Sequence, residues 1–156
     1  PRDEKAYARY KNLLNSDGAK TPDLSNGRHL FMRTCGSCHK MYGQGGEIGP
    51  DLTGSNRSNA DYLLFNILNP SEEIQDDYKM VVVTTRDGRT YSGNIVGENQ
   101  RQITMRVVGQ NDVVISKSSI QSKEVTPVSM MPQGLLNNLT DKETIDLLSY
   151  LQKANK

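Results

Sequence analysis

The chain has 156 residues and a formal net charge of +1, with acidic and basic residues interspersed. This length suits one ordinary domain or two very small ones. The balanced charge does not indicate a nucleic-acid or membrane surface, and no apolar run is long enough to predict a membrane span. Hydrophobic residues make up only 35% and Trp is absent, so a buried cofactor would add apolar bulk that the chain lacks.

The first seventy residues predict three short helices and a glycine-rich loop. Apolar residues at helical spacing predict helices at 2–14, from Thr21 to about Cys35, and at 59–68. Thr21 is the expected cap of the second helix and Pro22 suits its first turn. The loop from Met41 to Gly54 has no periodicity, and loops of that length usually wrap something.

Residues 78–125 are instead rich in β-branched residues. Short strands are expected at 79–85, 90–96, 101–108 and 113–116, and Asp87-Gly88 is a strong hairpin signal. We therefore expect a four- or five-stranded antiparallel meander, curled into a small barrel. This stretch resembles SH3-like barrels, some of which bind RNA, but residues 70–128 hold seven basic and eight acidic residues, so no nucleic-acid partner is expected.

The last part of the chain predicts an irregular segment followed by a helix. Residues 126–139 have no regular pattern, and Thr140 with Glu143 three residues later forms a capping box. In the helix that follows, Tyr150 is expected to lie against Gly27 of the second predicted helix.

The strongest chemical signal is the pentapeptide from Cys35 to His39, Cys-Gly-Ser-Cys-His. Two cysteines at this spacing suit a redox disulfide, half of a metal site or a haem attachment point, and the adjacent His favours haem. Each thiol can add to one haem vinyl group, and His39 then lies beneath the iron. A zinc site would need four ligands, and only two Cys and two His are present.

Further residues downstream suit a haem. The carbonyl of Pro50, in the segment Ile-Gly-Pro-Asp-Leu, suits the Nδ1–H of His39 and would leave Nε2 for the iron. Met130 and Met131 are both candidates for a sixth ligand, because a thioether favours ferrous iron; core packing is the usual role of Met. His29 is a further candidate ligand, although a solvated helix position is the plainer interpretation.

Several segments together resemble a class I cytochrome c. They are Gly27 to His39, Gly49-Pro50-Asp51-Leu52, Met131-Pro132 and Asp146 to Leu151. More narrowly, the chain resembles the haem-binding domain family of Pirellula/Verrucomicrobium type, a cytochrome c with a β-rich insert. The segments similar to that family are Asn66 to Ser71, Asp87-Gly88-Arg89, Ser129 to Leu135 and Leu139-Thr140.

This resemblance implies a mainly α fold, a class I cytochrome c interrupted by a small antiparallel β insert. Residues 1–70 and 128–156 would form the haem domain, and residues 71–127 the insert. One covalently bound haem c is expected, with Cys35 and Cys38 as anchors and His39 as proximal ligand. The family places the distal ligand directly before Pro, which selects Met131.

The expected function is the transfer of single electrons, without substrate chemistry, to or from a redox partner protein or an attached oxidoreductase domain. Two other functions stay open: a ligand-sensing haem domain with a labile sixth ligand, and a docking module whose β insert is the working surface. Covalent haem attachment implies a periplasmic or otherwise exported location. The chain begins at Pro1 without a start Met or signal peptide, so we expect a mature product or a segment of a longer protein. The oligomeric state is not predicted.

Overall fold

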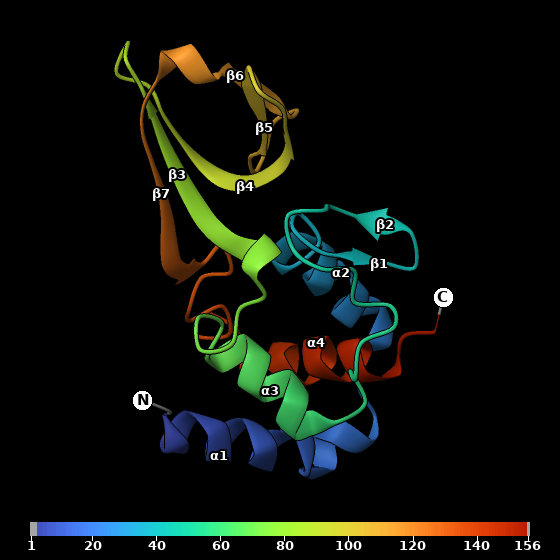
Figure 1. The fold of residues 1–156 in the computed structure, drawn as a ribbon. Coiled ribbons are helices and arrows are strands. Elements are labelled where there is room, and N and C mark those ends of the chain that lie inside the picture. Colours follow the sequence, from blue (N-terminus) through green and yellow to red (C-terminus); the bar gives the residue numbers. More distant parts are fainter. Residues whose placement is uncertain (1–2, 156) are drawn as a thin grey trace.

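A computed structural model describes residues 3–155, with the helices gathered in one part and a curled sheet in the other (Figure 1). The helices are α1 (Glu4–Leu14), α2 (Leu24–Thr34), α3 (Ala60–Leu68) and α4 (Asp141–Lys153), with 3-10 turns at Asp17–Lys20, Asp76–Tyr78 and Lys117–Ser119. The strands are β1 (Lys40–Met41), β2 (Gln44–Gly45), β3 (Lys79–Thr85), β4 (Thr90–Glu98), β5 (Gln102–Arg106), β6 (Val113–Ser116) and β7 (Ile120–Ser129).

The four predicted helices are all present, but the cap of α2 differs from the prediction. Thr140 and Glu143 form the predicted capping box at the start of α4. The cap predicted for α2 is wrong: the helix begins at Leu24, and the Asp23 carboxylate, not Thr21, accepts the Asn26 backbone N–H. Residue 2, included in the first predicted helix, lies outside the described residues.

The four α-helices share one hydrophobic core. Its buried side chains are Tyr10, Leu30, Phe31, Met41, Leu63, Leu64, Ile67, Leu136, Leu147, Leu148 and Leu151. Every α-helix contributes at least one of them, and Phe31 of α2 also contacts the Tyr150 ring of α4, with the ring centroids 5.7 Å apart. The helical part is therefore a closed unit whose geometry is set by helix packing.

The closest approach within this unit is between α2 and α4 at Gly27. A methyl group on Gly27 would lie 2.1 Å from the carbonyl oxygen of Asp146 and 2.7 Å from Cβ of Tyr150. The Asp146 side chain is buried and accepts hydrogen bonds from the backbone N–H of Asp23 and the side chain of Asn26. Lys142 adds an ion pair at 2.8 Å. Steric fit and a satisfied buried carboxylate thus fix α4 against the start of α2.

The β part contains one strand that the sequence pattern did not predict. Residues 126–129, expected to be irregular, belong to β7, which pairs with β3. The strand order is β6-β5-β4-β3-β7, so the last strand crosses back beside the first and the sheet is not a simple meander. A second hydrophobic core of Val81, Val83, Ile103, Met105 and Ile115 fills its inner face.

Helix accounts for 35% of the chain and strand for 25%, so the expectation of a mainly α fold is only partly met. The glycine-rich loop also differs slightly from expectation, because it includes the small β1–β2 hairpin. Among residues 3–155, no helix has both the length and the apolar character needed to cross a membrane.

We predict that Gly27→Ala destabilises the protein by about 1–3 kcal/mol, because the added methyl group forces α2 away from α4. Chemical denaturation followed by circular dichroism measures the change. Gly54→Ala is the matched control, since nothing lies within 4 Å of a Cβ there, and its effect should stay within about 0.5 kcal/mol. Equal unfolding midpoints for both variants would contradict the close-contact argument.

Because the Asp146 carboxylate is buried and hydrogen-bonded, we predict that the free energy of unfolding depends on pH. Burial alone would raise the pKa of Asp146, but its hydrogen bonds with Lys142, Asn26 and the Asp23 backbone hold that pKa below its usual range. Because the folded-state pKa is depressed, the stabilisation is complete above the unfolded pKa of about 4 and is lost as pH falls through the folded value. In urea titrations between pH 7 and pH 3, Asp146→Asn should show a shallower loss than the wild type; an unchanged slope would contradict this.

Candidate functional site

The predicted haem-attachment residues form a tight turn directly after α2. Cys35 ends the helix, with its backbone N–H 2.7 Å from the carbonyl oxygen of Phe31. The backbone N–H groups of Cys38 and His39 both donate to the carbonyl of Cys35, at 3.1 and 2.9 Å. The two cysteines are not joined by a disulfide. Helix α2, fixed against α4 at Gly27, therefore determines where this turn lies.

The glycine-rich loop wraps around this turn. Backbone N–H groups of Gly46, Gly49 and Leu52 donate to the carbonyls of Gly36, Cys38 and Lys40, at 2.8, 2.7 and 2.9 Å respectively. The approach is too close for a side chain: a methyl group on Gly46 would lie 2.0 Å from the carbonyl oxygen of Ser37. The glycines thus let the loop bond to residues 36–40 along their backbone.

The same loop orients the His39 ring. Nδ1 of His39 lies 2.8 Å from the carbonyl oxygen of Pro50, which can only accept, so Nδ1 carries the proton and Nε2 keeps its lone pair. The backbone at Gly49 lies against the ring, since a methyl group there would be 2.5 Å from Cε1. Burial lowers the pKa of His39, and the Pro50 bond opposes this only in part. The result is an oriented imidazole suited to bind a metal through Nε2.

The electrostatics of Cys35 do not suit a redox disulfide. Burial, with a smaller contribution from Cys38, raises the pKa of the Cys35 thiol to about 12. Thiols of disulfide oxidoreductases have lowered pKa values, because the thiolate is the nucleophile. A protonated, half-buried Cys35 packed against the helical core instead fits an anchor beside an apolar group.

The two candidate methionines lie just after β7. Met131 is half-buried and packs against the same helical core as Cys35 and Leu52. Met130 is also half-buried but is not among the residues that pack against either core. His29 is an exposed residue of α2. The role of Met131 as a ligand stays a prediction.

Arg57 has a role that the sequence did not reveal. A charged residue in a loop is usually solvated, but the Arg57 side chain is buried. Its guanidinium donates to the carbonyls of Leu52, Thr53, Leu151 and Ala154 and to the hydroxyl of Tyr42. It thereby joins the wrapped loop to the end of α4. Nothing in the local sequence indicates this, because two of the acceptors come from the other end of the chain.

Comparison with known proteins agrees with this site. Residues 22–82 match the family model described as cytochrome C oxidase, cbb3-type, subunit III. The matched segment includes α2, the Cys-His turn, the wrapped loop and α3, and it ends within β3. No curated protein matches the chain.

Fold, site and family match together support a c-type cytochrome, a class of protein that binds haem and transfers electrons. The residues fit such a group: an oriented imidazole, two unpaired thiols and an apolar core lie around one turn. The coarser functional expectation, haem-based electron transfer by a c-type cytochrome domain, is therefore supported.

We predict that Arg57→Lys destabilises the protein by about 2–3 kcal/mol, because one ammonium cannot serve the separate acceptors of a guanidinium and leaves buried carbonyls unpaired. Thermal unfolding at constant pH measures the loss. The matched control is Arg28→Lys, which alters an exposed bond to Gln44 and should change stability by less than about 0.5 kcal/mol. Similar losses in both variants would contradict a special role for Arg57.

Proposed function

We propose that the chain is a monohaem c-type cytochrome that carries single electrons. Cys35 and Cys38 anchor haem c covalently, His39 is the proximal ligand and Met131 the distal ligand. When bound, the haem iron takes up and releases one electron between its ferric and ferrous states. The observation that carries this proposal is the His39–Pro50 hydrogen bond of 2.8 Å beside the two cysteines.

The protein's own residues hold the geometry that electron transfer needs. Pro50 fixes the ring plane and the tautomer of His39, and the Gly49 backbone prevents the ring from tilting toward it. Met131 approaches from the segment after β7, with its side chain on the helical core. Little rearrangement is then required when the charge on the iron changes.

The proposal includes the domain organisation and setting. Residues 1–70 and 128–156 form the haem domain and residues 71–127 the insert, although β7 continues to Ser129. The resemblance to the insert-containing cytochrome family supports this division. The partner is a redox protein or an attached oxidoreductase domain, and covalent haem attachment places the protein in an exported location.

The test compares optical spectra of the ferric protein with those of Met131→Ala and Met130→Ala. A weak far-red band that reports Met–iron bonding should be present in the wild type, be lost in Met131→Ala and persist in Met130→Ala. The reduction potential of Met131→Ala should fall, because a thioether favours ferrous iron. Mass spectrometry should show one haem, lost when Cys35 and Cys38 are both replaced by Ala.

Loss of the band in Met130→Ala alone would assign the distal ligand to Met130. A wild type without the band that binds carbon monoxide rapidly in the ferrous state would contradict His/Met ligation and favour a ligand-sensing haem domain.

A further inference from the structure

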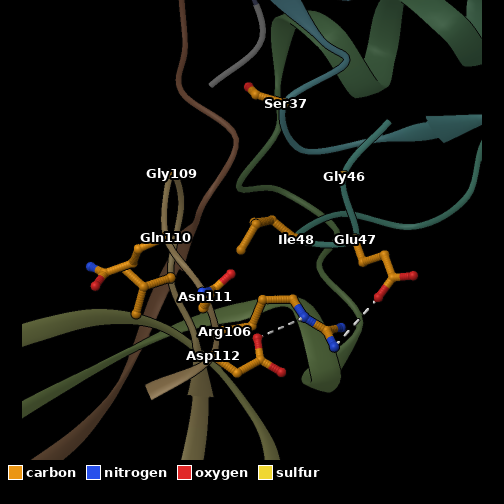
Figure 2. A pocket seen from close by; sticks show the side chains of 10 residues that line it. Ser37, Gly46, Glu47, Ile48, Arg106, Gly109, Gln110, Asn111 and Asp112 are labelled. Atoms are coloured by element: carbon orange, nitrogen blue, oxygen red, sulfur yellow. Dashed lines mark ion pairs between the residues drawn. The ribbon is translucent and has the colours of Figure 1, made fainter. Parts of the chain in front are cut away.

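Two polar contacts tie the β part to the helical part at separate places. Where the chain passes between the two parts, the backbone N–H of Ser129 donates to Oγ of Ser71 at 3.1 Å. Farther along the sheet, the guanidinium of Arg106 in β5 lies 3.4 Å from the carboxylate of Glu47 in the wrapped loop (Figure 2). Arg106 also lies 3.5 Å from Asp112, within the β part itself.

Ile48 of the glycine-rich loop is buried beside the second contact, but it belongs to neither of the two hydrophobic cores. The helical core and the sheet core share no residue. A pocket of about 590 Å³ lies between them, with Ser37, Gly46 and Ile48 on one side and residues 109–112 on the other (Figure 2). The Arg106–Glu47 pair crosses this region between partly exposed side chains, and such ion pairs are weak and screened by salt.

Met131 is attached to both parts. The backbone N–H of Met131 donates to Oγ of Ser129, the last residue of β7, at 3.0 Å. Strand β7 pairs with β3 from Ile120 to Val125 and, after an irregularity in register, again at Ser129 opposite Lys79, so the backbone just before Met131 is bonded to the sheet. The Met131 side chain, in contrast, packs against the helical core. Met131 is therefore one of the places where a displacement of the sheet would act on the helical part.

We propose that the Arg106–Glu47 contact is a clasp that holds the β insert where it keeps Met131 on the haem iron. Release of the clasp weakens the sixth ligand and opens the iron to a small neutral ligand such as carbon monoxide. This inference rests on the proposed haem function and on Met131 as the distal ligand. It gives the insert a task, the control of ligation, that electron transfer alone does not require.

The effect should be moderate in size. The side chains of Arg106 and Glu47 are 29% and 53% exposed, and pairs with such exposure change an equilibrium by about two- to fivefold. Salt should act in the same direction, because it screens the pair. The clasp therefore biases Met131 binding and does not switch it fully.

The test uses the haem-loaded protein and three variants. Arg106→Gln and Glu47→Gln both break the clasp. Arg106→Gln also removes the contact with Asp112, and Glu47→Gln also removes the 2.8 Å ion pair between Glu47 and Lys40 within the loop. Asp112→Asn removes only the contact within the β part. Carbon monoxide association with the ferrous protein should be about two- to fivefold faster in the first two variants and unchanged in Asp112→Asn. The far-red ferric band should weaken in the same two variants. Added salt should reduce the difference between these variants and the wild type, both in association rate and in band intensity.

Hydrogen exchange gives a readout that does not depend on ligand binding. The amides of residues 107–112 should exchange faster in Arg106→Gln and Glu47→Gln than in the wild type. Faster exchange with an unchanged band and unchanged carbon monoxide kinetics would show that the hairpin moves without affecting Met131, and would overturn the clasp.

The two proposals fail in different ways. A wild type without the far-red band contradicts Met131 ligation, and the clasp falls with it. A wild type with the band, together with variants whose band and association rates match it, leaves the electron carrier intact and overturns the clasp alone.

Discussion

The contact between α2 and α4 at Gly27 is the constraint on which the rest of the site depends. The helices approach so closely that no side chain fits at this position, and the buried Asp146 carboxylate accepts the hydrogen bonds that the start of α2 offers. Because α2 is fixed in this way, its last residue is fixed as well, and the Cys-His turn begins there. Helix packing far from the chemistry thus determines where Cys35 and His39 lie.

The site itself is assembled mainly from neighbours in sequence. Residues 36–52 bond to one another along their backbone, and Pro50 orients His39 from within the same segment. Long-range order enters through Arg57, whose guanidinium ties this segment to the end of α4. A local unit with one strong tether can keep its shape while other parts of the molecule move. Such rigidity suits an oriented metal ligand, whose binding depends on small changes in geometry.

The sequence predicted what depends on short-range patterns. The α3 boundaries, the start of α4 with its Thr140 capping box, and the β3 and β6 segments follow from periodicity and caps, and the structure agrees. It did not predict β7, because this edge strand is mostly exposed and lacks the alternation of apolar and polar residues. Nor did it reveal the burial of Arg57 or the pairing of Arg106 with Glu47, since their partners are distant in sequence. Patterns predict elements, whereas polar contacts between elements need the folded chain.

The position of the β insert has a consequence for the candidate ligand. An insert elsewhere on the surface would leave the helical core unaffected, but the last strand here, β7, ends two residues before Met131. The two hydrophobic cores share no residue, and the Ser129–Ser71 hydrogen bond and the Arg106–Glu47 pair are polar contacts between the sheet and the helical part. The strength of a Met–iron bond depends on how freely the sulfur can approach. In the proposed cytochrome, a sheet with its own hydrophobic core directly before the ligand connects that approach to a weak contact between partly exposed charges.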